Sequence, residues 1–306
     1  MAICEEQASY IDKQPRTQPA VEFPYEDIQA TTQIRILELL PAGHGDPLKG
    51  RLVVEASNSL GPFEAVSYCW GPREAVDNIE CNGKSLHINA AVSGILRQFR
   101  RPDDPHRLWV DAICINQSLK SEKDAQVPLM RDIYSKASRV RIWLGQDEER
   151  SGEAFDLIQE TCNAITRAQE KHGPQPTLAQ LFACDLPTNR DDRWTTLNAL
   201  LNRPWFQRTW ILQEVSLAQT ALLHSGPHTC PWPTLAHIST ILFHTQAHNA
   251  LNTFAITYAA RIAMIAFQDA RTVDKTLAGL LIATVGLGVS NLRDRVYALL
   301  GLAGGV

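Results

Sequence analysis

A carboxylate and an indole one helical turn apart are the first candidates for chemistry in this sequence. Glu214 follows Trp210 by four residues, in a segment that we predict to be helical from 204 to 218. A carboxylate beside the apolar stripe of such a helix is partly desolvated, which suits it to electrostatic work on a positive charge. The alternative is a surface glutamate paired with Arg203 or Arg208, and spacing alone leaves both interpretations open.

Two further polar segments, 67–71 and 111–117, each end a near-continuous apolar run. In open α/β sheets, ligands bind beyond the carboxyl ends of the strands, so both segments are candidate binding loops. They offer a hydroxyl, an indole, a flexible glycine, a carboxylate and two amides: Ser67, Trp70, Gly71, Asp111, Asn116 and Gln117. Each also has a structural interpretation, since serine bonds backbone, tryptophan fills cores and asparagine favours turns.

Histidines offer a weaker signal for chemistry. His237, His244 and His248 share one face of a predicted helix, but no acidic residue lies near them in the sequence to complete a metal site. The pair Gly286 and Gly288 is only part of a dinucleotide fingerprint and follows no βαβ unit, so we interpret it as a loop. We therefore expect neither a metal nor a resident cofactor.

The elements that must position these side chains alternate between strands and helices. Near-continuous apolar runs predict strands at 64–69, 108–113 and 140–144, buried on both faces as in a parallel sheet covered by helices. Helices are predicted between them, at 89–100 and 126–137. We therefore expect an α/β fold in which the three strands are neighbours in one mainly parallel sheet.

Further segments flank this core. Residues 1–24 are polar and predict a loose tail, whereas two strands at 34–40 and 51–56 predict an N-terminal β-hairpin. The polar, helical stretch 147–190 is interpreted as an insertion. Most of the chain from 232 to 306 has a helical pattern.

Composition excludes several classes of protein. The 306 residues are 44% hydrophobic and 20% charged, which is typical of a folded globular chain. The net charge of −4 provides no basic field for nucleic acid. No apolar run is long enough for a membrane span, and the N-terminus lacks an export signal. Seven cysteines without a C-x-x-C pair favour a reducing compartment, so we expect a soluble cytoplasmic protein.

Several blocks in a fixed order resemble the fungal heterokaryon incompatibility (HET) domain. They are FEAVSYCWG at 63–71, LWVDAICINQ at 108–117, QVPLMRDIYSKA at 126–137, RPWFQRTWILQEV at 203–215 and RDRVYALLGL at 293–302. The resemblance covers roughly residues 25 to 302 and implies a single domain over 25–306. It implies a role in non-self recognition and programmed cell death.

HET domains are also similar, remotely, to TIR domains, which have a flavodoxin-like α/β fold. That comparison implies a TIR-like core over about 62–226, with 64–69 and 108–113 as its first two strands. TIR enzymes that cleave NAD carry a catalytic glutamate four residues after a tryptophan, and Trp210 and Glu214 reproduce this spacing.

The resemblance therefore implies hydrolysis of NAD at the bond between nicotinamide and ribose, with NAD as substrate rather than cofactor. Glu214 is the expected catalytic residue. The expected binding residues are Ser67, Trp70, Gly71, Asp111, Asn116, Gln117 and Trp210. The alternative is a non-catalytic signalling module that transmits death signals by self-assembly. In either case we expect the trigger to come from self-association or from a separate sensor protein.

Overall fold

The computed structural model of this chain describes residues 23–43, 45–72, 74–147, 150–267, 274, 276–289 and 292–303. Nearly all of the predicted tail, residues 1–22, lies outside them. The described chain forms one nine-stranded sheet in the order β5-β4-β2-β1-β6-β3-β7-β8-β9. Its strands are β1 (Gln33–Leu39), β2 (Leu48–Ala56), β3 (Glu64–Tyr68), β4 (Ala75–Cys81), β5 (Lys84–Asn89), β6 (His106–Trp109), β7 (Arg139–Trp143), β8 (Ala221–Ser225) and β9 (His228–Pro231).

The centre of the sheet consists of four parallel strands, β6-β3-β7-β8. Glu64 of β3 is in register with Leu108 on one side and with Arg139 on the other. The prediction that the strands near 64–69, 108–113 and 140–144 are neighbours is therefore confirmed. All five residues of β3 are buried, as expected for a strand covered on both faces.

The sheet as a whole is mixed rather than mainly parallel, which corrects the prediction. Four pairings are antiparallel: β1 with β2, β1 with β6, β4 with β5, and β8 with β9. The predicted N-terminal hairpin is β1–β2. The hairpin β4–β5 was not predicted, because its strands have polar, partly exposed sequences that lack an apolar run.

The sequence predicts a strand from Leu108 to Ile113, but the chain does not stay extended over this whole run. Strand β6 ends at Trp109, and the short helix α2 (Asp111–Cys114) follows. The Asp111 carboxylate accepts a hydrogen bond from the backbone N–H of Ala112 at 2.7 Å. Ile113 and Cys114 are buried against the sheet, so the helical turn is as apolar as a strand and hydropathy does not distinguish the two.

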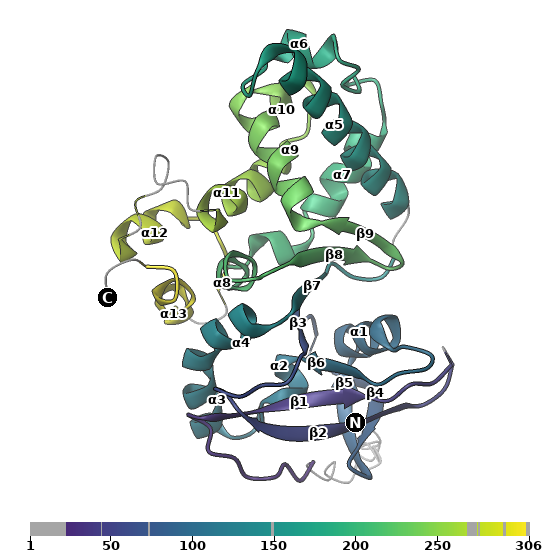
Figure 1. Cartoon of the computed structure of the whole chain (residues 1–306), viewed down its shortest axis with the longest axis vertical. Coiled ribbons are helices and arrows are strands. Elements are labelled where there is room, and N and C mark those ends of the chain that lie inside the picture. Colours follow the sequence, from purple (N-terminus) through teal and green to yellow (C-terminus); the bar gives the residue numbers. More distant parts are fainter. Residues whose placement is uncertain are drawn as a thin grey trace, which may run out of the picture.

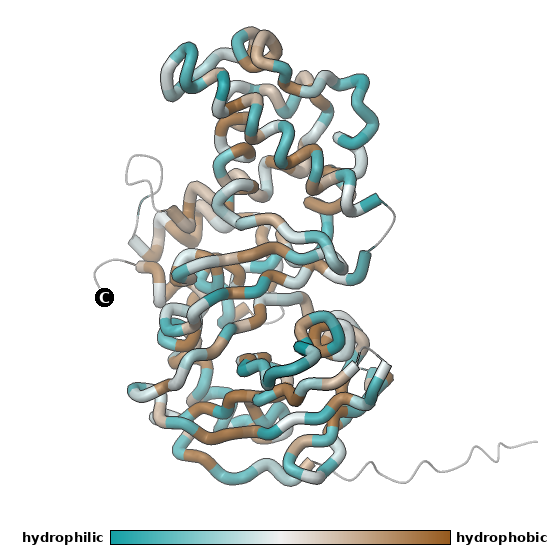
Figure 2. The backbone as a smooth tube through the Cα atoms, turned by 45° about the vertical axis from the view of Figure 1, so that its right-hand side comes forward, coloured by the Kyte–Doolittle hydropathy of each residue, from teal (hydrophilic) through white to brown (hydrophobic). Residues whose placement is uncertain are grey.

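Helices cover both the sheet and its β8–β9 edge (Figure 1). They are α1 (Ala90–Phe99), α3 (Lys120–Gln126), η1 (Val127–Leu129), α4 (Met130–Lys136), α5 (Ser151–His172), α6 (Leu178–Phe182), α7 (Arg193–Leu201), η2 (Pro204–Gln207), α8 (Ile211–Ser216), α9 (Trp232–His244), α10 (Ala247–Ala250), α11 (Ile256–Ala266), α12 (Leu277–Ala283) and α13 (Asp294–Leu300). Figure 2 shows apolar residues alternating with polar ones along most of these helices, as expected where one helical face is buried.

The predicted helix from 204 to 218 is broken in the structure. The 3-10 helix η2 ends at Gln207, Arg208 is extended, and α8 begins at Ile211. The break arises because Arg208 pairs with Gly288, whose carbonyl accepts the backbone N–H of Thr209 at 3.1 Å. A partner eighty residues along the chain therefore overrides the local helical pattern.

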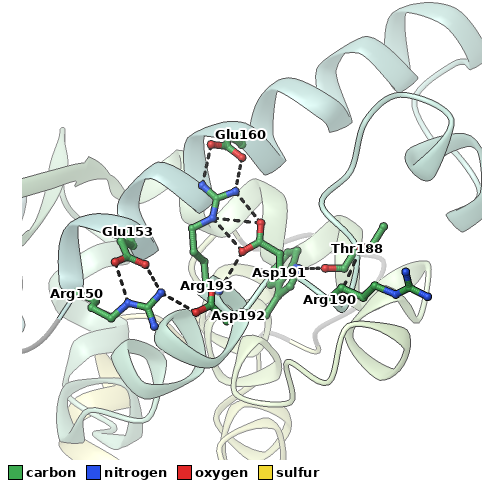
Figure 3. Close-up of polar contacts among 9 residues, drawn as sticks. Arg150, Glu153, Glu160, Thr188, Arg190, Asp191, Asp192 and Arg193 are labelled. Carbon is green, nitrogen blue, oxygen red and sulfur yellow. Dashed lines mark hydrogen bonds and ion pairs between the residues drawn. The ribbon is translucent and has the colours of Figure 1, made fainter.

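The stretch interpreted as an insertion packs into the helical layer formed by the C-terminal helices. Helix α5 contacts α7, α9 and β9. Figure 3 shows how arginines tie α5 to the start of α7. Arg193 bonds both oxygens of Glu160 at 2.8 and 2.7 Å, and Arg150 bonds Glu153 and Asp192. These ion pairs are largely exposed, so each contributes little to stability.

Candidate functional site

A cavity of about 690 Å³ lies beyond the carboxyl ends of β3 and β6. This volume is in the range of sites for drug-sized ligands. Residues from the ends of both strands line it, together with residues of α3, η2, the 208–214 segment and the C-terminal part of the chain. Six of the sequence-predicted site residues line this one cavity: Trp70, Gly71, Asp111, Gln117, Trp210 and Glu214.

Glu214 lies at the buried base of the cavity, with only 3% of its surface exposed. Ser67 of β3 donates a short hydrogen bond to one of its carboxylate oxygens. The indole N–H of Trp205 donates in turn to the Ser67 hydroxyl at 2.7 Å. The backbone N–H of Glu214 bonds the carbonyl of Trp210 at 3.3 Å, so the one-turn relation between these two residues survives the break in the helix.

The environment of Glu214 shifts the pKa of its carboxyl group upward. Burial raises the pKa of this carboxyl above its usual value, and the neighbouring Asp111 adds to the effect. The charge of Arg208 and the hydrogen bond from Ser67 act in the opposite direction. A carboxylate with a raised pKa, open to a cavity and with a cation nearby, is typical of a functional group rather than of a surface residue.

Asp111 is the second carboxylate of the site, and it is partly buried. The indole N–H of Trp70 donates to it at 2.7 Å, so this pair fixes both side chains at the cavity wall. Burial raises the pKa of Asp111, against the lowering effect of Trp70 and Arg208. Gln117 donates through its side-chain amide to the backbone carbonyl of Asp111 at 2.9 Å. Trp70 therefore supplies the hydrogen-bond partner that this partly buried carboxylate requires.

Gly71 follows β3 in the left-handed region of backbone conformation, with φ of +64°. L-residues rarely adopt this conformation, whereas glycine does so without strain. No heavy atom lies within 4 Å of the position that a Cβ would take, so space does not explain the glycine. The turn conformation does, and it directs the chain away from the sheet at the cavity wall.

Two predicted binding residues do not line the cavity. The Asn116 side chain accepts a hydrogen bond from the backbone N–H of Ser118 at 3.0 Å, which is the turn role left open by the sequence. Ser67 is fully buried and contacts Glu214 instead of the open space.

Sequence reasoning missed three charged residues that line the cavity: Lys123, Arg208 and Asp294. Arg208 had been considered only as an ion-pair partner. It is partly buried and donates a short hydrogen bond to the carbonyl of Tyr68. Burial opposes its charge, but the carboxylates of Glu214 and Asp111 raise the pKa of Arg208. Lys123 lies outside the family blocks and Asp294 lies within the block 293–302, but the sequence assigns chemistry to neither, and only the fold brings them to the site.

The C-terminal part of the chain completes the cavity wall. Gly288 and Val289 line the cavity, and the Gly288 N–H bonds the Gln207 carbonyl at 2.5 Å. Helix α13 also contacts α8, where the Gln213 amide lies 3.4 Å from the Tyr297 carbonyl. The loop containing Gly288 is thus a structural part of the site, which its partial glycine pattern did not indicate.

No cluster of three potential metal ligands occurs among the residues that the structure describes. His237 lies 3.3 Å from the Gln169 side chain, and His248 stacks on Phe243. These histidines therefore make ordinary helix-surface contacts. Nor is any helix of the described chain long and apolar enough to cross a membrane.

Comparison with known proteins agrees with the motifs. The heterokaryon incompatibility protein (HET) family matches residues 63–214, the stretch from β3 to Glu214. The chain is 25% identical to heterokaryon incompatibility protein 6, OR allele, of Neurospora crassa, over 92% of its own length. It spans about half, 49%, of that relative's length. No solved structure matches it. This chain belongs to the heterokaryon incompatibility (HET) domain family.

Proposed function

We propose that this chain acts as a cell-death effector in fungal incompatibility by hydrolysing NAD at the nicotinamide–ribose bond. The observation that carries the proposal is the placement of Glu214. Its carboxylate is buried, is held by Ser67, follows Trp210 by one turn, and faces a ligand-sized cavity. The relative in Neurospora is named for heterokaryon incompatibility, which supports the cellular role.

The chemistry that the site supports is cleavage of a bond to a cationic leaving group. As the bond from ribose C1′ to the nicotinamide nitrogen breaks, nicotinamide leaves as a neutral molecule and positive charge develops on the ribose. Ionised Glu214 stabilises that charge, and water adds to C1′ with loss of a proton. The products are nicotinamide, ADP-ribose and one proton.

Other cavity residues have roles consistent with this substrate. The rings of Trp70 and Trp210 line the cavity and offer flat faces for a nicotinamide or adenine ring. Arg208 favours the ionised form of Glu214. Lys123 has no ion-pair partner among the described residues, which leaves its ammonium group for a phosphate.

Strand order supports the relation to TIR domains that we propose. Numbered by their order in the chain, the parallel strands β3, β6, β7 and β8 lie in the order 2-1-3-4. Flavodoxin-like sheets begin with the same order. We assign residues 62–226 to this TIR-like core, within a single domain over 25–306 that also includes the helices at 147–190 and 232–306.

We also propose that activity requires self-association or a separate sensor protein, because an enzyme that constantly depletes NAD would kill its own cell. If self-association is the trigger, specific activity rises with protein concentration. A flat specific activity over a hundredfold range of concentration would contradict that trigger and leave the sensor protein.

The alternative, a non-catalytic assembly module, has one observation in its favour. Large apolar side chains are exposed on and beside α12 and α13, with Ile282 73% and Leu292 79% exposed. Exposed apolar groups that gather in one region are typical of interaction surfaces.

The test uses chromatography to measure the release of nicotinamide from NAD by the purified protein at high concentration. The wild type and a Glu160→Gln variant, altered on the exposed face of α5, are expected to release nicotinamide equally. Glu214→Gln is expected to lose it while keeping its fold. If the wild type releases none, or Glu214→Gln matches it, the assembly module becomes the better account.

A further inference from the structure

A buried chain of hydrogen bonds runs from the core to Glu214. The indole N–H of Trp205 lies 2.7 Å from the Ser67 hydroxyl oxygen, and that hydroxyl contacts the Glu214 carboxylate. Trp205 and Ser67 are fully or almost fully buried, and neither lines the cavity. Trp205 therefore reaches the site only through Ser67.

The direction of this chain follows from the chemistry of its members. An indole N–H donates and never accepts, so Ser67 must accept from Trp205. The single proton of the serine hydroxyl is then directed to Glu214. We infer that Trp205 is a positioning residue, which fixes the Ser67 hydroxyl so that it holds the Glu214 carboxylate at the base of the cavity.

Two other buried tryptophans show that the core does not require a partner for every indole N–H. The indole N–H groups of Trp109 and Trp232 are also buried, yet neither has a hydrogen-bond partner among the described residues. Trp232 even packs edge-to-face against Trp205, with ring centroids 6.0 Å apart. Of these three buried indoles, the one that finds a partner is the one next to Glu214.

The rings around Trp205 hold it rigid. Phe206 packs edge-to-face against it with centroids 4.9 Å apart, and Trp232 contacts it from α9. Positioning through a packed ring is stronger than positioning through a mobile side chain, because its rotamer is already fixed by the core.

Several groups face Glu214, and three of them affect its ionisation. Ser67 comes from β3, Arg208 from the segment before α8, Asp111 from α2 and Tyr134 from α4. Of these, Ser67 and Arg208 favour the ionised carboxylate, whereas Asp111 disfavours it. A Ser67 hydroxyl that is free to turn away holds the ionised form less well, so the pKa of Glu214 rises when Trp205 loses its N–H.

The test compares Trp205→Phe with Trp232→Phe, two identical changes in neighbouring buried rings. The inference rests on the proposed NAD cleavage only for its kinetic readout. In that readout, Trp205→Phe moves the acid limb of the pH–rate profile to higher pH, and activity recovers as pH rises. Trp232→Phe leaves the limb where it is in the wild type.

A second readout needs no enzymatic activity. The side-chain carboxyl carbon of Glu214, assigned in ¹³C NMR spectra by its loss in Glu214→Gln, reports its titration directly. Ser67→Ala is expected to raise the midpoint by about one pH unit, and Trp205→Phe by a smaller amount in the same direction. The double variant is expected to equal Ser67→Ala, since both changes act through one hydroxyl.

The outcomes separate the two proposals. A raised midpoint without any NAD cleavage would support the positioning role and overturn the enzymatic one. An unchanged midpoint in Trp205→Phe, or an equal shift in Trp232→Phe, would overturn the positioning role even in an active enzyme. If Trp205→Phe does not fold, Ser67→Ala decides, and an unshifted midpoint there overturns the inference.

Discussion

Two buried glutamates at the two ends of β3 have opposite environments. Glu64 begins the strand, whereas Glu214 is bonded by Ser67 near the strand's other end. Glu64 accepts hydrogen bonds from His106, at 3.0 Å, and from Arg141, with Arg139 3.8 Å away. Glu214 has one hydrogen bond from a neutral hydroxyl and a cavity beside it.

The two glutamates have pKa shifts in opposite directions. Burial alone would raise the pKa of Glu64, but hydrogen bonds from His106 and Arg141 lower it to about 2. For Glu214, burial is not overcome, and the pKa is raised. Partners around a buried carboxylate, rather than burial itself, decide whether it holds the fold together or is available for chemistry.

The largest effect on stability is expected from Glu64→Gln. The change removes the negative charge while leaving Arg141 in place, so a largely buried guanidinium loses its charged partner. We expect a loss of about 3–5 kcal/mol in the free energy of unfolding, measured by urea denaturation. A loss below 1 kcal/mol would show that Glu64 does not have the structural role that we assign to it in contrast to Glu214.

In the wild type, low pH should remove the contribution of Glu64 to stability. The folded pKa of Glu64 is about 2, below the ordinary value of 4.5, so its contribution is complete above pH 4.5 and is lost as the pH falls toward 2. This contribution is on the order of 3 kcal/mol. Melting temperatures across this range should fall more steeply in the wild type than in Glu64→Gln, and parallel curves would refute the assignment.

At the other end of the strand, Trp70→Phe should have a moderate effect. It removes the N–H that bonds Asp111 at 2.7 Å but keeps an aromatic ring at the cavity wall. We expect a loss of about 1–3 kcal/mol in unfolding free energy, because a partly buried carboxylate loses a donor. Urea denaturation of Trp70→Phe and Glu64→Gln under the same conditions checks this order of effects. If Trp70→Phe loses as much stability as Glu64→Gln, the order is wrong.

The smallest effect is expected where a carboxylate is exposed. Lys120 and Asp124 form an i,i+4 pair on α3 at 2.7 Å, with most of both side chains in solvent. Lys120→Ala should leave the free energy of unfolding unchanged within experimental error. A clear loss of stability in thermal or urea unfolding would mean that exposure is a poor guide in this molecule.

Local patterns predicted the strands of the central sheet because each is a nearly continuous apolar run. Helix α1 was equally readable, since Asn89 caps it through a bond to the Val92 N–H at 3.0 Å. Also predictable was the convergence of Trp70, Asp111 and Glu214, because strand ends and the flanking helix share one edge of the sheet.

Long-range pairings account for what the sequence did not predict. The break at Arg208 depends on Gly288, and the cavity wall near Asp294 depends on how α13 packs. The structural roles of Ser67 and Asn116 depend on which neighbour each side chain meets. Hydropathy and spacing carry no information about such partners, which only the folded chain brings together.

One crossed measurement tests the central contrast most directly: Glu64→Gln and Glu214→Gln, each assayed for stability and for nicotinamide release per folded molecule. We predict that Glu214→Gln keeps nearly wild-type stability and loses about 10²–10³ in rate, the usual cost of removing one preorganised electrostatic group. Glu64→Gln is predicted to lose stability and keep its rate. If Glu214→Gln keeps the wild-type rate, or if both variants lose rate and stability together, the division of roles between the two ends of β3 is wrong.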